Sequence, residues 1–192
     1  MKISVLVLSA ALALPAAAQG PGVAVVPTAP APPAAHAAAG LKMPWNRVKD
    51  ILVRAAEKMP EENYAFKASP DVRSFGQLVG HVADANFMFA AMAAGEKPAP
   101  RDIEKTKTSK ADLVAALKES FAAGDKVFAA GDADFSVATK LFGMDTTRFG
   151  VVGLLVAHDW EHYGNMVTYM RIKGIVPPSS EPRPEPARPA TK

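Results

Sequence analysis

Three of the four histidines have the spacing of a metal site. His158 and His162 are four residues apart, so on a helix they would share one face with their Cβ atoms about 6 Å apart. His81 lies in another apolar segment and would complete a three-imidazole site if the two segments pack face to face. Three neutral nitrogens plus a water make an open coordination shell of the kind found in reactive zinc sites.

The ligand type leaves the identity of the metal open. Imidazole suits zinc, and it also suits nickel, iron and copper. We therefore predict one divalent metal ion at His81, His158 and His162, zinc first, with nickel or iron as alternatives. The competing interpretation is that each of these histidines is a hydrogen-bonded core residue.

Three carboxylates lie close to these histidines in the sequence. Asp84 comes one helical turn after His81, while Asp159 and Glu161 stand between the paired histidines. Such a carboxylate could accept the second N–H of a ligand imidazole, or it could act as a general base. Glu161 and Asp84 are our candidate catalytic residues. The alternative is that Asp84 and Asp159 are solvated surface charges.

The run from His158 to His162 also matches H-x-x-E-H, the motif of inverted zinc peptidases. A peptidase of that kind needs a further carboxylate ligand from a long domain after the motif. Thirty residues follow His162, and most of them are Pro-rich. A peptidase is therefore a minor alternative.

The apolar residues around the histidines recur with the period of a helix. The histidines belong to the apolar stripes of two predicted helices. No strand pattern is convincing, so we predict an all-α fold, an antiparallel four-helix bundle. The four helices are predicted over residues 44–59, 74–95, 109–131 and 147–173.

Local signals mark the ends of these helices. Ser74 and Gln77 have the spacing of a capping box, and Asp112 stands in the same relation to Ser109. Pro44 suits a first helical turn, and Gly174 suits a helix end. Two other segments remain, a predicted loop over 96–108 and a short packing piece, extended or helical, over 132–145.

Aromatic and methionine side chains within the helices are interpreted as core, although they could line a pocket above the metal. Trp160 and Tyr163 are likewise expected to pack or to lie at the surface rather than to contact substrate. The first group consists of Phe87, Met88, Phe89, Met92, Met166 and Met170.

Both ends of the chain differ in composition from its middle. Lys2, the apolar run 3–14 and the alanines at 16–18 form the pattern of a secretory signal peptide, cut after Ala18. The run is shorter than the roughly 20 apolar residues of a membrane span, so no stable membrane anchor is expected. We predict a protein exported to the periplasm or secreted.

Proline marks the edges of the domain. Eleven of the seventeen prolines lie within 20–40 or 177–192, and segments of that composition bury no core. His36 falls in the first of them and receives no role. The predicted organisation is a signal peptide over 1–18, a linker over 19–40, the bundle over 41–176 and a Pro-rich disordered tail over 177–192.

Composition excludes several classes of protein. The chain has no cysteine, which rules out disulfides, a cysteine nucleophile and any zinc site with cysteine ligands. Its net charge is +3, and no basic cluster is interleaved with aromatic residues, so nucleic-acid binding is not expected. A length of 192 residues and a hydrophobic content of 49% fit one globular domain.

Two stretches of the chain resemble the DinB-like (DinB/YfiT) superfamily of metal-binding four-helix bundles. One is QLVGHVADA at 77–85, followed by GEKP at 95–98. The other is HDWEHYGN at 158–165, followed by a Tyr-x-Arg and a Gly/Pro-Pro exit. This second stretch is the more specific, although Asn165 stands where Gln is commoner. The resemblance extends from about Trp45 to Ser180.

The resemblance implies metal binding by a histidine triad, which maps onto His81, His158 and His162. Characterised relatives include thiol-dependent S-transferases and a mycothiol-dependent isomerase, and dimers are frequent. A metal that accepts a thiolate lowers the pKa of the thiol, which activates it as a nucleophile.

We therefore expect an exported metal-dependent enzyme of thiol S-transferase or hydrolase type. Its expected partners are a small-molecule substrate or thiol and a second copy of the chain as a homodimer. The alternative is a non-catalytic exported bundle that binds a metal or another ligand.

Overall fold

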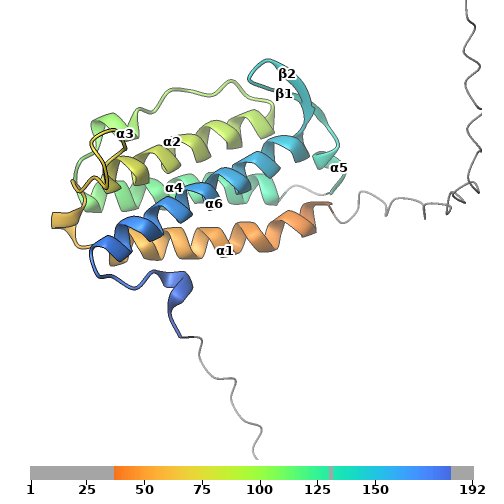
Figure 1. Cartoon of the computed structure of the whole chain (residues 1–192). Coiled ribbons are helices and arrows are strands. Elements are labelled where there is room, and N and C mark those ends of the chain that lie inside the picture. Colours follow the sequence, from red (N-terminus) through yellow and green to blue (C-terminus); the bar gives the residue numbers. More distant parts are fainter. Residues whose placement is uncertain (1–36, 130–131, 183–192) are drawn as a thin grey trace, which may run out of the picture. The chain divides into compact units, whose positions relative to one another are not determined.

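The computed structural model describes residues 37–129 and 132–182, which are mostly helical (Figure 1). The predicted signal peptide, most of the predicted linker including His36, and the end of the tail lie outside the described residues. No helix among the described residues has the length and apolarity needed to cross a membrane. The long helices are α1 (Ala37–Lys58), α2 (Phe75–Ala94), α4 (Lys110–Phe128) and α6 (Arg148–Ile172). The shorter elements are η2 (Glu61–Asn63), α3 (Ile103–Thr106), α5 (Asp132–Phe135), β1 (Ala138–Leu141), β2 (Met144–Thr147) and η3 (Pro178–Ser180).

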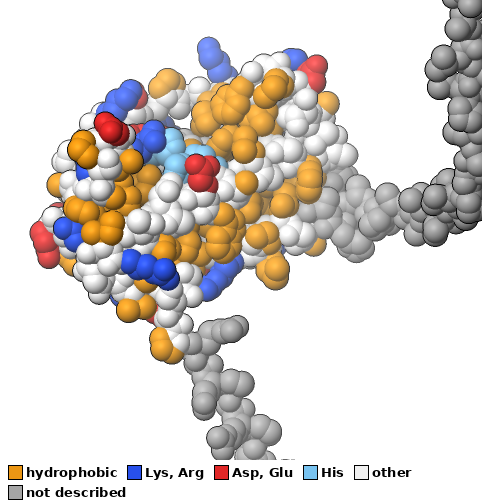
Figure 2. Space-filling view, in the orientation of Figure 1, with side chains coloured by type: hydrophobic (Ala, Val, Ile, Leu, Met, Phe, Trp, Pro, Cys, Tyr) orange, Lys and Arg blue, Asp and Glu red, His pale blue; other side chains and the backbone are white. Residues whose placement is uncertain are grey.

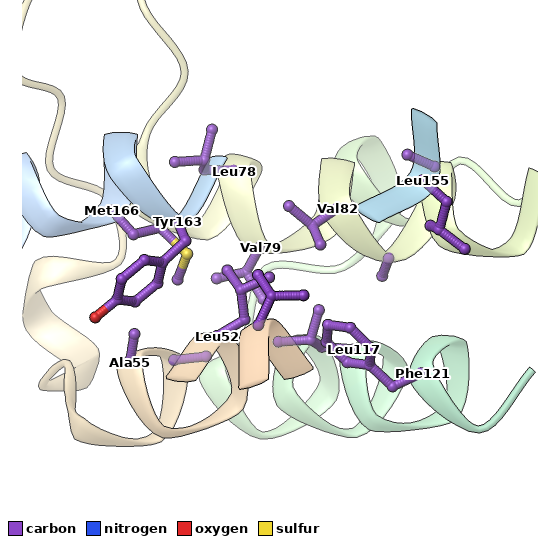
Figure 3. Close-up of a cluster of buried hydrophobic side chains, with 14 of the residues drawn as sticks. Leu52, Ala55, Leu78, Val79, Val82, Leu117, Phe121, Leu155, Tyr163 and Met166 are labelled. Atoms are coloured by element: carbon purple, nitrogen blue, oxygen red, sulfur yellow. The ribbon is translucent and has the colours of Figure 1, made fainter. Parts of the chain in front are cut away.

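The four long helices share one apolar core. α2 packs against α4 and α6, and α1 packs against the same two helices. Because the chain has no cysteine, burial of apolar surface must supply most of the stabilisation. Figure 3 shows part of this core, including Leu52, Ala55, Val79, Val82, Leu117, Phe121, Leu155 and Met166.

Trp45 of α1 packs against α4 and forms a hydrogen bond with it. Its ring is fully buried, and its Nε1 donates a hydrogen bond to Oδ1 of Asp125 at 2.8 Å. The ring lies 5.1 Å, centre to centre, from the rings of Phe121 and Phe128. A Cβ on Gly124 would lie 2.5 Å from the Trp45 ring, so a glycine is needed there to admit the indole.

The capping box predicted at Ser74 and the helix end predicted at Gly174 are both present. Ser74 forms both hydrogen bonds of the capping box, since its Oγ accepts from the Gln77 N–H and its N–H donates to Gln77 Oε1. Gly95 ends α2 in the left-handed region at φ 77°. Thr147 caps the first turn of α6, and Gly174, at φ 71°, lies just beyond the end of that helix.

A hairpin occupies most of the segment that was predicted to be a short extended or helical packing piece. β1 pairs antiparallel with β2, and Phe142 and Gly143 form the turn with φ values of 50° and 84°. Positive φ at both central residues is the requirement of a two-residue hairpin turn. The sequence showed no convincing strand pattern here because each strand has only four residues, none of them buried. The predicted loop at 96–108 likewise contains the short helix α3.

α1 begins at Ala37, seven residues before its predicted start at Pro44. The prediction that Pro44 occupies the first turn was therefore wrong. Pro44 has no N–H to bond the carbonyl of Gly40, and the helix continues through it without that bond. Alanine is the strongest helix former, so the alanines at 37–39 favour this extension.

Candidate metal centre

The three histidines predicted to bind a metal lie together. His81 is in α2, and His158 and His162 lie on the part of α6 that packs against α2. Nε2 of His158 is 3.2 Å from Nε2 of His81 and 3.0 Å from Nε2 of His162. One ring nitrogen from each histidine lies within 4.8 Å of the other two. The group could therefore hold a metal ion.

The spacing of these nitrogens fits a small divalent ion. In a tetrahedral zinc site with Zn–N bonds of about 2.0–2.1 Å, two ligand nitrogens lie about 3.3–3.4 Å apart. The observed separations of 3.0 and 3.2 Å are slightly shorter. Three imidazoles would fill three of the four positions of such a site, and a nitrogen-only set also suits nickel or iron.

Glu104 contacts the triad, and the sequence did not reveal it. Its Oε2 is 3.3 Å from Nδ1 of His81, so it can accept the proton that leaves Nε2 of His81 free for a metal. Its Oε1 accepts a hydrogen bond from Nε of Arg73 at 2.9 Å. Glu104 lies in the segment predicted to be a loop, 23 residues after His81, and no periodic spacing connects the two.

α3 is held on α2 by Asp84 and Gly80. Oδ1 and Oδ2 of Asp84 accept the backbone N–H groups of Ile103 and Glu104, at 3.0 and 2.9 Å. A Cβ on Gly80 would lie 2.7 Å from Cα of Glu104, so the close approach of the two backbones depends on glycine. Asp84, predicted to be a catalytic candidate, is thus engaged in placing Glu104 beside His81.

The second nitrogens of the paired histidines have different surroundings. Nδ1 of His162 is 3.3 Å from the side-chain amide of Asn165, which can present its oxygen to that nitrogen after a rotation of the amide. Nδ1 of His158 is buried and has no hydrogen-bond partner among the described residues. Two of the three imidazoles therefore have a polar neighbour that can fix the tautomer.

All three imidazoles are held neutral at pH 7. Burial, followed by the nearby rings of His162 and His81, lowers the pKa of His158 to about 3. Burial is also the largest cause of the lowered pKa values of His81 and His162. A neutral imidazole has a free lone pair, which is the form that binds a metal.

The other two carboxylates occupy opposite environments. Asp159 is fully buried, and neither of its oxygens has a partner among the described residues. Burial raises the pKa of Asp159 well above its ordinary value. The interpretation of Asp159 as a solvated surface charge was therefore wrong. Glu161 is exposed and lines a cleft beside His162.

Two clefts border the triad. One, of about 730 Å³, is bordered by His162, and the other, of about 400 Å³, by His81. Glu104 lines both of them. Figure 2 shows histidine side chains reaching the surface on this face, among charged and hydrophobic side chains. A small molecule could therefore reach the triad from solvent. The larger cleft is also lined by Lys67, Arg73, Gln77, Glu161, Asn165 and Tyr169.

The aromatic and methionine residues are mostly core, as predicted. Met166 and Met170 are fully buried, and Tyr163 is nearly so. Met88 differs, because it lines the smaller cleft beside His81. Trp160 is partly exposed. The remaining members of the group, Phe87, Phe89 and Met92, belong to the core or pack against it.

Comparison with known proteins agrees with this fold. Residues 45–166, more than half of the chain, match the family model of the DinB superfamily. The structure is similar to that of a DinB-like protein from Bacillus cereus ATCC 10987, with a TM-score of 0.65 and 16% sequence identity over 73% of this chain and 95% of that chain. It is also similar to a DinB-like protein from Bacillus subtilis, with a TM-score of 0.61 and 21% identity over 76% of this chain and 99% of that chain.

At these identities the likeness to solved structures shows the fold alone. No curated protein matches the sequence. The match over residues 45–166 is the finding that decides the family, and it confirms the resemblance seen in the sequence. The chain belongs to the DinB superfamily.

Proposed function

We propose that this protein is a metal-dependent enzyme of thiol S-transferase or hydrolase type. Its single divalent ion, zinc or alternatively nickel or iron, would be bound by His81, His158 and His162. The observation that carries this proposal is the convergence of three neutral imidazoles beside two clefts. A divalent ion bound there would supply Lewis acidity and so would lower the pKa of a thiol or a water.

The surrounding carboxylates have separate roles in this proposal. Glu104 accepts the Nδ1 proton of His81 and so directs its Nε2 lone pair toward the ion. Asp84 positions Glu104 through the backbone of α3. Glu161 lies on the cleft wall, where its carboxylate can take a proton from a bound substrate.

The wider organisation of the protein is also proposed. The four long helices would form an antiparallel four-helix bundle, with the triad between α2 and α6. A signal peptide over residues 1–18 would export the protein to the periplasm or out of the cell. The partners would be a small-molecule substrate or thiol and a second copy of the chain.

Ligand access to the ion tests the enzyme proposal. Residues 19–192 would be loaded with cobalt(II), and 2-mercaptoethanol would then be added. We expect a thiolate-to-cobalt charge-transfer band, because three imidazoles leave a coordination position open. The His158→Ala variant should remain folded by circular dichroism and should give no such band. A cobalt site that binds no thiol would favour a non-catalytic metal-binding bundle instead.

A further inference from the structure

Arg73 is a cation that Glu104 holds beside the triad. Its Nε donates to Oε1 of Glu104 at 2.9 Å, and the other oxygen of Glu104 contacts His81. The backbone carbonyl of Arg73 accepts a hydrogen bond from the hydroxyl of Tyr169 at 2.6 Å. Both the side chain and the backbone of Arg73 are therefore held by hydrogen bonds. Its positive charge also contributes to lowering the pKa of each of the three histidines.

The outer edge of the Arg73 guanidinium is free. Neither Nη atom has a hydrogen-bond partner within residues 37–129 and 132–182. The side chain is 42% exposed, and it lines the larger cleft together with His162. Two parallel N–H groups on a planar fork match the two oxygens of a carboxylate.

The charges around this cleft favour an anion once a divalent ion is bound. Glu104 and Arg73 form an ion pair and offset each other. The neutral histidines do not offset the charge of the ion, and Lys67 adds a second cation to the cleft wall. Asp71 and Glu161 also line the cleft, but neither forms an ion pair with Arg73. An anionic group is therefore best placed at the Nη edge of Arg73.

We propose that Arg73 binds a carboxylate of the substrate, so that the substrates are small anionic molecules whose other end reaches the metal. This inference rests on the proposed function of the same site. It assigns the larger cleft, beside His162, to the charged part of the substrate. The smaller cleft contains Ala85, Met88, Pro98 and Pro100 and would take an apolar part.

Two thiols of the same chain length, one anionic and one neutral, test this assignment. The cobalt-loaded protein would be titrated with 3-mercaptopropionate and with the neutral 3-mercaptopropionamide, with the charge-transfer band as the readout. We expect the carboxylate to bind roughly tenfold more tightly than the amide, the size of one charge-assisted hydrogen bond. Arg73→Gln should remove this preference, and Arg73→Lys should keep part of it. Arg47→Gln, on the exposed face of α1, is the matched control and should leave the preference unchanged.

Failure of this inference can be distinguished from failure of the proposed function. If cobalt does not bind, or if it binds but no thiol reaches it, the proposed function fails and the inference fails with it. If both thiols bind the wild-type metal site equally, only the role of Arg73 is overturned. Loss of the preference in Arg101→Gln rather than in Arg73→Gln would place the anion in the smaller cleft, which Arg101 lines, and would also overturn the proposal.

Discussion

Gly80 and Glu104 meet through their backbones, so that a Cβ on Gly80 would lie 2.7 Å from Cα of Glu104. This contact allows α3 to rest on α2 and brings the Glu104 carboxylate to His81. The neighbouring atom is backbone and cannot rotate away as a flexible side chain could. The environment of the triad therefore depends on a residue that has no side chain.

Gly80→Ala should displace α3 and weaken metal binding. The Ala methyl group would overlap the α3 backbone, so we expect destabilisation of about 1–3 kcal/mol despite the better helix propensity of alanine. Metal affinity should fall as well, because Glu104 would move. Urea unfolding and competition with a chromophoric chelator measure the two effects.

Gly153→Ala is the matched control for that substitution. Gly153 also lies inside a long helix, but a Cβ there would have no atom within 4 Å. We expect it to stabilise the protein by about 0.5–1 kcal/mol, because alanine favours the helix more than glycine does. Equal effects of Gly80→Ala and Gly153→Ala on stability and on metal affinity would show that the α2–α3 contact is unimportant.

Glu104→Ala should lower metal affinity by roughly 10- to 100-fold, the usual effect of removing a carboxylate that orients a ligand histidine. Glu104→Gln should lower metal affinity less, because an amide oxygen can still accept a hydrogen bond from the Nδ1–H group of His81. Chelator competition on the folded variants gives both affinities. Glu62→Ala, an exposed change, serves as the control. If Glu104→Ala bound the metal with wild-type affinity, Glu104 would have no part in metal binding.

The fold of this chain was predictable where the signals are local. The caps at Ser74 and Ser109 involve residues within three positions of each other, so the sequence alone reveals them. His158 and His162 follow from helical spacing, and the apolar surroundings of His81 indicate that it faces the same interior. These observations were sufficient to place the triad.

The unpredicted features depend on tertiary contacts. α3 is stabilised by the carboxylate of Asp84, nineteen residues before it, so Glu104 carries no local signal. Asp159 was misassigned because α6 packs against both α1 and α2, and its buried surface is wider than one apolar stripe. The hairpin at 138–147 is too short and too exposed to give a periodic pattern.

The metal-free protein should lose stability as the pH falls from 6.5 toward 3. The folded-state pKa of His158 is about 3, while its ordinary value is 6.5, so between these values the unfolded chain binds more protons than the folded protein. The stabilisation is fully present above pH 6.5. Urea midpoints at pH 7.5 and pH 5 measure the loss, and His158→Gln should reduce it. If His158→Gln lost as much stability as wild type between these pH values, the loss could not be attributed to His158.

Asp159 should have the opposite pH dependence. Its folded-state pKa is raised by burial, so the folded protein retains a proton that the unfolded chain releases. The stability from this proton is present at low pH and is lost as the pH rises through the raised pKa. Asp159→Asn removes the titration, so the variant should gain stability relative to wild type between pH 5 and pH 8.

Free energies of unfolding at the two pH values measure that gain. Asp71→Asn, at an exposed position, should show no such change. A constant difference in stability between Asp159→Asn and wild type at both pH values would show that the pKa of Asp159 is not raised in the folded protein.

The central claim is that His81, His158 and His162 bind one metal ion. Its most direct test is the metal content, by mass spectrometry, of residues 19–192 purified without an affinity tag or a chelator. We predict about one equivalent of zinc, nickel or iron per chain, lost in His81→Ala, His158→Ala and His162→Ala. The absence of metal in the wild-type protein, even after reconstitution, or an unchanged content in the three variants, would contradict the account.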